Sequence, residues 1–385
     1  MMSVKEKCFS YIDTNREKMI SLWQELVNID SGSDYKEGVD TAINKVADIL
    51  RNIGGNTRIA ENHNAGNMLV SEFGDTTKPF IILLGHLDTV FNKAGTAKER
   101  PFTIKDGKAF GPGALDMKGG IVILLYVLAA LKQINYSRYP VKVILLGDEE
   151  TAHVNSDAVN FMTKESQGAI AAFNFETGFM DDSIVVARKG VMRFSLETFG
   201  RSAHVGNDPE NGRSAIKELA HKILDIEALT DWSRGINLNV GVIEGGTVAN
   251  AAPAYAKMIC DMRYTTPEIV PEKLAQFKAI ADKVYVQDVT TKLEIISEMP
   301  PMVYLDTSKE LFELVKAIYE EEDFGHPKAI TVGGGSDSAY TTAAGIPTMC
   351  AMGVKGARNH TVEEFADVES LFMRAKLMIA ILLRL

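Results

Sequence analysis

Residues 81–84 form an unbroken apolar run, Ile-Ile-Leu-Leu, and this run constrains the fold more than any other stretch. Such a run, β-branched at its start, predicts a strand that is buried on both faces of a sheet. His86 and Asp88 follow two positions apart, so both side chains are expected to point into one space beyond the strand end. In open α/β sheets, binding sites lie at that edge. The pair therefore indicates either a metal-binding histidine oriented by a carboxylate or a structural histidine–aspartate pair.

The composition is that of a globular protein, and 385 residues are enough for about two domains. A net charge of −10 argues against nucleic acid as a partner. The N-terminus has no apolar signal core, and no apolar run reaches the length of about 18 residues expected of a membrane helix. The three cysteines, Cys8, Cys260 and Cys350, have no metal-site or disulfide spacing. We therefore expect a cytoplasmic protein that binds neither nucleic acid nor membrane.

Strands and helices alternate along the first part of the chain. Strands are expected at 67–71, 81–85, 141–146 and 169–175, helices at 4–27, 35–53 and 121–131, and a surface loop at 91–112. This alternation predicts an α/β domain with a mixed, mostly parallel sheet flanked by helices.

The pattern changes near Lys189. From there to Pro300-Pro301 the expected order is strand–helix–strand–strand–helix–strand, which resembles a ferredoxin-like α+β module. After the prolines the α/β character returns and ends in a helix with one apolar face. We therefore expect an α/β domain in two parts, residues 1–189 and 302–385, with an inserted domain at 190–301.

Acidic and imidazole side chains recur at the ends of the expected strands. They are His86, Asp88, Asp116, Glu149, Glu150, Glu176 and, late in the chain, His360. If one sheet edge gathers them, the carboxylates cannot all stay ionised unless cations neutralise them. Imidazole and carboxylate ligands without thiolates suit zinc, cobalt or manganese, and two ions that share a carboxylate need about this many ligands.

The adjacent pair Glu149-Glu150 is expected to have two different roles. Neighbouring side chains point in different directions, so one can bind metal while the other holds water as a general base. The alternative for Asp148-Glu149-Glu150 is a solvated acidic turn. Its position after a buried strand, together with the other motifs, favours the functional interpretation.

Five segments, in this order, resemble the di-zinc metallopeptidase family of glutamate carboxypeptidase, acetylornithine and succinyl-diaminopimelate deacetylases, aminoacylase and peptidase T. They are His86-Leu87-Asp88, Gly111-Pro112-Gly113-Ala114-Leu115-Asp116-Met117-Lys118-Gly119, Asp148-Glu149-Glu150, Phe175-Glu176 and His360. The resemblance spans nearly the whole chain and includes the family's inserted lid domain. It implies a catalytic α/β domain with two divalent ions per subunit, zinc first, with cobalt and manganese as alternatives.

Carried over by position, the resemblance implies a role for each residue of this group. Asp116 bridges both ions, His86 and Glu176 complete one metal site, Glu150 and His360 complete the other, Glu149 is the general base, and Asp88 orients His86. The peptide bond after Asp116 is often cis in this family.

In the inserted domain, Gly200–Gly206 resembles the lid segment whose histidine, here His204, reaches the partner subunit's active site. Asn250 and Arg263 match lid residues that bind the substrate near its scissile group and its carboxylate, for which a planar guanidinium is suited. Gly334 lies in a glycine triplet that we interpret as a substrate-flanking turn. The alternatives are an incidental surface histidine and, for Arg263, a structural salt bridge. The resemblance also implies a homodimer formed through this domain.

The sequence therefore predicts a di-metal amidohydrolase that cleaves an amide next to a free carboxylate in a small peptide or N-acyl amino acid. Glutamate carboxypeptidase-like exopeptidase activity is the first interpretation, N-acyl-amino-acid deacetylation the second and tripeptide aminopeptidase activity the third. A metal-dependent binding protein without catalysis is the rival from another class, although neither the general base nor a metal ligand is missing.

Overall fold

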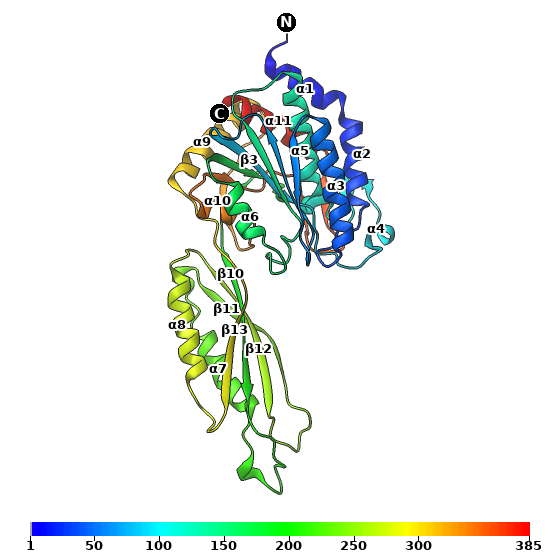
Figure 1. The fold of residues 1–385 in the computed structure, drawn as a ribbon. Helices are drawn as coiled ribbons and strands as arrows, with labels where there is room; N and C mark the ends of the chain where they lie inside the picture. Colours follow the sequence, from blue (N-terminus) through cyan, green and yellow to red (C-terminus); the bar gives the residue numbers. More distant parts are fainter. Residues whose placement is uncertain (1) are drawn as a thin grey trace. The chain divides into compact units, whose positions relative to one another are not determined.

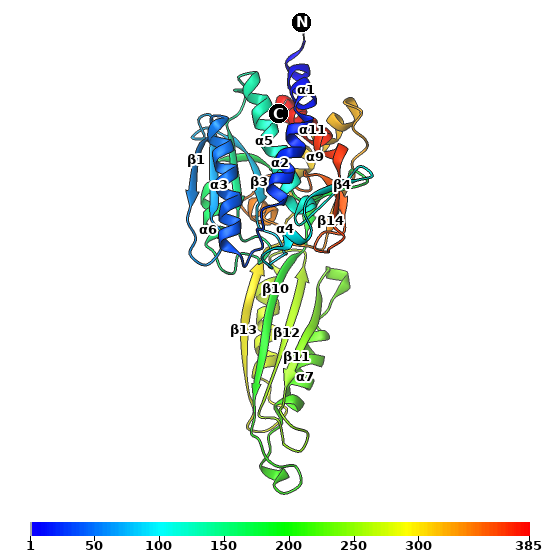
Figure 2. The same ribbon diagram turned by 90° about the vertical axis from the view of Figure 1, so that its right-hand side faces the viewer.

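The structure, a computed structural model, describes residues 2–385, and the chain divides into two compact units (Figure 1, and Figure 2 after a quarter turn). Unit 1 contains the chain up to Ala187 together with Tyr304–Thr331 and Ser336–Leu385. Unit 2 contains Arg188–Val303 and Val332–Gly335. Each unit has its own hydrophobic core.

A six-stranded mixed sheet forms the centre of unit 1, in the order β1-β2-β6-β3-β7-β15. The strands are β1 (Asn56–Ala60), β2 (Met68–Phe73), β3 (Phe80–His86), β6 (Val141–Leu146), β7 (Ala169–Asn174) and β15 (Thr348–Met349). Strands β6, β3, β7 and β15 run parallel, and β1 and β2 pair in antiparallel fashion. Every residue of β3 is buried, as expected of a strand with both faces covered. The predicted mixed, mostly parallel sheet is confirmed.

Helices flank this sheet. They are α1 (Val4–Thr14), α2 (Arg16–Val27), α3 (Lys36–Asn52), α5 (Gly119–Gln133), α6 (Ala158–Glu165), α9 (Asp306–Glu321), α10 (Ser338–Ala343) and α11 (Val368–Arg384). Helix α5 is apolar on nearly all sides because it packs against β3 and is itself covered by α1, α2 and α11 (Figure 1). The prediction of one helix over residues 4–27 was wrong, because α1 ends at Thr14 and Asn15, whose side chain donates to the carbonyl of Tyr11, separates it from α2.

One helical stretch, Ala114–Gln133, is long and apolar enough to cross a membrane by length and composition alone, with a mean hydropathy of 1.9. This stretch joins the kinked turn η1 (Ala114–Lys118), which contains Asp116 and Lys118, to the apolar helix α5, so it is not an unbroken apolar run. Of its most apolar window, 94% is buried inside the protein, as in the core helix of a globular domain.

Two smaller sheets complete unit 1. One has the order β4-β5-β17-β16-β8, and the other pairs β14 with β9. Their strands are β4 (Thr103–Lys105), β5 (Lys108–Phe110), β8 (Gly178–Phe179), β9 (Ile184–Arg188), β14 (Ala329–Val332), β16 (Lys355–Ala357) and β17 (Phe365–Asp367). The segment expected to be a loop, 91–112, contains β4, β5 and the short helix α4 (Thr96–Glu99). The local pattern could not show this, because β5 is ordered by pairing with the distant β17.

Unit 2 is an antiparallel sheet, β11-β12-β10-β13, with α7 and α8 packed against one face. Its elements are β10 (Gly190–Phe199), η2 (Pro209–Asn211), α7 (Ala215–Glu227), η3 (Trp232–Arg234), β11 (Asn237–Gly245), β12 (Tyr255–Tyr264), α8 (Ile269–Asp282) and β13 (Thr290–Met299). Along β12 every second residue is buried, the period of two that a sheet covered on one face requires. The predicted ferredoxin-like α+β domain is confirmed.

Residues Val332–Gly335 depart from the expected boundaries. The second part of the α/β domain was expected to include them, whereas they belong to unit 2. Lys189 N donates to Val332 O at 3.0 Å, and Arg263 Nη1 donates to Gly333 O at 3.2 Å. These donors lie far away in the sequence, so no local pattern could assign the segment to unit 2.

Candidate metal centre

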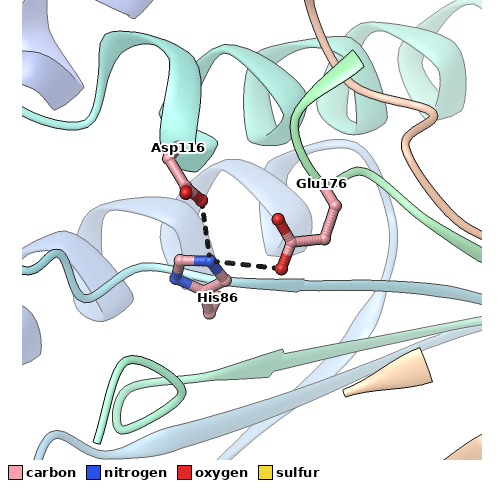
Figure 3. Close-up of side chains that lie close together, drawn as sticks. All are labelled: His86, Asp116 and Glu176. Atoms are coloured by element: carbon pink, nitrogen blue, oxygen red, sulfur yellow. Dashed lines mark ion pairs between the residues drawn. The ribbon is translucent and has the colours of Figure 1, made fainter. Parts of the chain in front are cut away.

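His86, Asp116 and Glu176 lie together at the carboxyl end of the sheet in unit 1 (Figure 3). His86 is the last residue of β3, and Glu176 follows the neighbouring parallel strand β7, so both reach the same edge. Asp116 comes from η1. His86 Nε2 is 3.3 Å from Asp116 Oδ1 and 3.6 Å from Glu176 Oε1. All three side chains are buried.

The turn η1 approaches the end of β3 closely, which explains the glycine before His86. A Cβ atom at Gly85 would lie 2.5 Å from Cε of Met117, well inside contact distance. Gly85 therefore lets the segment that carries Asp116 pack directly onto the strand that carries His86. The peptide bond between Asp116 and Met117 is cis, as the resemblance implied.

Asp116 also belongs to a second group, with Glu150 and His360. His360 Nε2 is 3.2 Å from Asp116 Oδ2 and 3.3 Å from Glu150 Oε2. Because Asp116 directs Oδ1 to the first group and Oδ2 to this one, its carboxylate lies between them. The structure thus brings together the five residues that the sequence predicts as metal ligands.

Several atoms of the two groups have no hydrogen-bond partner within the described residues. His86 Nε2, Asp116 Oδ1 and Glu150 Oε1 are buried and make no hydrogen bond there. A buried polar atom left unpaired costs about 1–3 kcal/mol. In each group the potential ligand atoms lie within 4.8 Å of one another. Since imidazole and carboxylate donors suit zinc, cobalt or manganese, these residues fit two divalent ions that share Asp116.

Asp88 is buried and holds the turn that carries Glu149 and Glu150. Its Oδ1 accepts from Glu149 N at 3.1 Å, and its Oδ2 accepts from Glu150 N at 3.0 Å and from Ser33 Oγ at 2.8 Å. His86 Nδ1 lies 3.1 Å from the main-chain oxygen of Asp88 and 3.4 Å from its Oδ1. The contact of Asp88 with His86 was expected, whereas its hydrogen bonds to the backbone amides of Glu149 and Glu150 were not.

The cluster concentrates negative charge, and this changes the pKa values of its members. Burial raises the pKa of Glu149 well above its usual value, and the charge of Glu176 adds to this against the opposing effect of His86. Hydrogen bonds to Asp116 and to a second carboxylate raise the pKa of His360 to about 10. In the metal-free protein, protons on imidazole therefore offset part of the negative charge, and divalent ions would replace them.

Two further residues contact the segment of Asp116 and were not predicted. Asn359 Nδ2 donates to Asp116 Oδ2 at 3.3 Å, and its position directly before His360 is the one signal in the sequence. Glu364 is buried, and its Oε1 accepts from a backbone amide of η1 at 2.8 Å. Burial raises the pKa of Glu364 to about 8, and the charge of Asp116 adds to this. Nothing in the local sequence distinguishes Glu364 from its exposed neighbour Glu363.

Two of the residues expected to act from the inserted domain lie side by side in unit 2. His204 and Asn250 are both exposed. The chain segments that carry them pair, because Val205 N donates to Asn250 O at 3.0 Å and His204 forms a bridge with Ala251. Two polar side chains are therefore presented from one edge of this unit.

Arg263, on β12, is partly buried and already paired. Its Nε and Nη2 donate to the two carboxylate oxygens of Asp261 at 2.6 and 3.0 Å, the salt bridge that was the structural alternative. Gly334 lies nearby in the chain segment that Arg263 contacts, and its carbonyl accepts from Arg188 Nη1 at 3.3 Å. The guanidinium plane of Arg263 is thus fixed by Asp261.

Comparison with known proteins identifies the class to which this site belongs. Residues 82–384 match the family described as Peptidase family M20/M25/M40. Carboxypeptidase G2 of Pseudomonas sp. (strain RS-16) is 26% identical over 369 residues, which cover 94% of this chain and 88% of that protein. Succinyl-diaminopimelate desuccinylase of Psychrobacter arcticus is 26% identical over 316 residues, which cover 77% of this chain and 76% of that protein. The crystal structure of aminopeptidase PepT from Bacillus cereus ATCC 10987 shares the fold, with a TM-score of 0.77, 24% identity and coverage of 96% of this chain and 98% of that one.

The fold, the two ligand groups and these relatives define a metal-dependent hydrolase of peptide or amide bonds with an inserted lid domain. The chain belongs to peptidase family M20/M25/M40, whose match covers most of its length. The family and the enzyme class expected from the sequence are confirmed.

Proposed function

We propose that this protein is a carboxypeptidase that releases a C-terminal residue, with glutamate as the first residue to test, and that it uses two zinc ions. The observation that carries the proposal is the pair of three-residue groups that share Asp116. The likeness to carboxypeptidase G2 over 94% of this chain supports the choice of reaction.

The residues of the cluster have distinct roles in this proposal. Asp116 would hold both ions, with His86 and Glu176 on one and Glu150 and His360 on the other. Bound zinc supplies a Lewis acid and lowers the pKa of bound water.

Glu149 is the residue that moves the proton. Its Oε2 lies 4.0 Å from His86 Nε2, so its carboxylate faces the same space as the ligands. From this position Glu149 would take a proton from the attacking water and give it to the nitrogen of the leaving amine.

The proposal includes a homodimer formed through unit 2, in which His204 of one copy stabilises the oxyanion in the other. Strand β11 is an edge of the unit 2 sheet, and Val242 and Ile243 on it are more than half exposed. Exposed apolar side chains on a free sheet edge favour association with a second copy. Mixing Glu149→Ala chains with His204→Ala chains should then restore activity in heterodimers, and no recovery in a protein shown to exchange subunits would contradict this role.

A cytoplasmic location is part of the same proposal. Cys8, Cys260 and Cys350 are all buried and none forms a disulfide, which suits a reducing compartment. Small peptides or N-acyl amino acids would be the substrates there.

N-acyl-amino-acid deacylation is the second candidate, because succinyl-diaminopimelate desuccinylase shows the same 26% identity as carboxypeptidase G2, although over a shorter part of the chain. The deciding assay loads the protein with zinc or cobalt and measures release from dipeptides ending in glutamate, from N-acyl amino acids and from tripeptides. Release of C-terminal glutamate supports the proposal, and cleavage of N-acyl amino acids alone favours the deacylase. Release of N-terminal residues from tripeptides alone favours the aminopeptidase, and no turnover with any set favours a binding protein.

A further inference from the structure

A buried ion pair lies at the far end of the turn that carries Glu149 and Glu150. His153 Nε2 is 2.6 Å from Asp337 Oδ1, and the two side chains are 0% and 1% exposed. His153 follows Glu150 by three residues, and Asp337 is the residue before α10. Neither residue has a role in the proposed reaction.

The turn itself adopts an unusual backbone conformation. Ala152 N donates to Glu149 O at 2.8 Å, and His153 N donates to Asp148 O at 3.1 Å, so the chain folds back on itself. Ala152 and His153 have φ values of 58° and 59°, a region that residues other than glycine rarely adopt. Two adjacent residues in this region are unfavourable, so contacts from outside the turn must stabilise it.

Two anchors supply those contacts. Asp88 accepts from the amides of Glu149 and Glu150 at one end, and Asp337 binds the ring of His153 at the other. Among the described residues, the remaining atoms of the pair, His153 Nδ1 and Asp337 Oδ2, are buried without a hydrogen bond. Burying two charges with half of their polar atoms unpaired is a poor way to gain stability. The geometry that the pair imposes is therefore its more useful contribution.

The segment of Asp337 also contacts the strand end that leads to Glu176. Ser336 Oγ and Ser338 Oγ, on either side of Asp337, each accept from Asn174 Nδ2 at 3.0 Å. Asn174 is the last residue of β7, two positions before Glu176. This contact uses the serine side chains, so it remains when only the carboxylate of Asp337 is changed.

We propose that His153 and Asp337 are positioning residues that hold Glu149 and Glu150 in their working places. Loss of the pair should weaken the ion held by Glu150 and His360 and spare the ion held by His86 and Glu176, because those two residues come from other strand ends. The kinetic part of this inference rests on the proposed reaction, whereas the metal-binding part rests only on the two proposed zinc ions.

The test compares variants that remove the hydrogen bond with one that retains it. His153→Phe keeps the ring that packs 5.8 Å from the ring of Tyr340, and Asp337→Ala removes the acceptor. Asp337→Asn keeps an acceptor oxygen for His153, so it should retain the zinc content and kcat of the wild type. After dialysis, zinc content should fall from two ions per chain toward one in the first two variants and stay near two in Asp337→Asn. With a substrate that the wild type cleaves, kcat should fall about tenfold to a hundredfold at unchanged KM, the cost of a misplaced group.

Lys222→Met is the matched control, because it breaks the buried ion pair with Glu218 in unit 2. It should lower the unfolding temperature and leave zinc content and kcat unchanged. Equal loss of both ions, or a lowered unfolding temperature with zinc content and kcat intact, overturns the positioning role of His153 and Asp337. If Asp337→Ala does not fold, the zinc content and kcat of His153→Phe test the positioning role instead. If the wild type cleaves no substrate, the proposed function fails, and the zinc content still tests the pair.

Discussion

The two units differ in how they accommodate buried charge. In unit 2, Lys222 is 1% exposed, and its Nζ donates to three main-chain carbonyl oxygens at the C-terminal end of α8. Its partner Glu218 directs Oε1, which makes no hydrogen bond among the described residues, to 3.2 Å from Lys222 Nζ, and its Oε2 accepts from two backbone amides. In unit 1, by contrast, three such atoms, His86 Nε2, Asp116 Oδ1 and Glu150 Oε1, belong to one cluster of carboxylates and imidazoles.

This difference separates structural charge from functional charge. A buried ion pair that the protein neutralises and hydrogen-bonds itself contributes to the fold. Several buried carboxylates and imidazoles that converge on one space, with some of their atoms left without a hydrogen bond, indicate a ligand, here the divalent ions. Perturbing the cluster in unit 1 should therefore affect catalysis and metal binding, whereas perturbing the pair of Lys222 and Glu218 in unit 2 should affect stability.

The largest effect is expected at Glu149. Glu149→Ala should lower kcat by about 10²- to 10⁴-fold, the usual contribution of a general acid–base. Both ions should remain bound, because Glu149 belongs to neither ligand group. Glu150→Ala should instead lose one ion. Metal analysis of the two variants beside their kcat values checks this, and equal metal loss in both would refute the division of roles.

The next effect is on the stability of unit 2. Lys222→Met leaves Glu218 buried without its cation, which should lower the free energy of unfolding by about 3–5 kcal/mol. Urea denaturation, followed by a signal that reports on unit 2, measures this change in the free energy of unfolding. The double variant Glu218→Gln, Lys222→Met removes both charges and should recover much of the loss. A single variant as stable as the wild type would show that the pair is not structural.

Arg263 is expected to have a smaller effect, on substrate binding. A charge-assisted hydrogen bond to the substrate carboxylate contributes about 1.5–3 kcal/mol, so Arg263→Ala should lower kcat/KM roughly tenfold to a hundredfold. Arg263→Lys should restore only part of this, since an ammonium group cannot form the bidentate contact. Amidating the substrate's carboxylate should cost the wild type a similar factor and the Ala variant little.

Asp261→Asn supplies the control for Arg263, because Asp261 holds its guanidinium. If Arg263 serves only the salt bridge, Arg263→Ala and Asp261→Asn will each lower kcat/KM by the same factor for the free acid as for the amide, so that the preference of the wild type for the free acid remains. An amidated substrate that the wild type cleaves as well as the free acid would exclude carboxypeptidase activity.

The smallest effect is a pH dependence of stability in the metal-free protein. Burial raises the pKa of Glu364 from its usual value of 4.5 to about 8. Between these values the folded state holds a proton that the unfolded state has released. Stability should therefore fall as the pH rises, with a slope of up to about 1.4 kcal/mol per pH unit. Glu364→Gln should flatten this dependence of stability on pH. Urea denaturation at several pH values measures it, and the same change of stability per pH unit in Glu364→Gln as in the wild type would show that Glu364 ionises normally.

The part of the site that could be predicted from the sequence lies where a local rule applies. The period of two along β3 places His86 and Asp88 on one side, and the buried strand before Glu149 and Glu150 places them at the same edge. The roles of Asp116 and His360, by contrast, depended on resemblance to a known family, because the residues alone do not show which strand ends meet.

The unpredicted residues are those whose partners are distant in the chain. His153 and Asp337 are 184 positions apart, and Glu364 is 249 positions from the amide that it binds. Each resembles an ordinary polar residue of a turn, because burial and partner are decided only when distant segments pack. The break at Asn15 was missed for a related reason, since the apolar period continues through it while the backbone does not.

The division of unit 2 into two stretches of chain has a consequence for exchanging parts between relatives. A graft of Arg188–Val303 alone would leave Val332–Gly335 of the recipient behind. The carbonyl oxygens of these four residues would then meet donors from a foreign chain in place of Arg188, Lys189 and Arg263. A chimera that preserves the unit needs both pieces, so the short glycine segment and the large insertion have to be exchanged together although 28 residues separate them (Tyr304–Thr331).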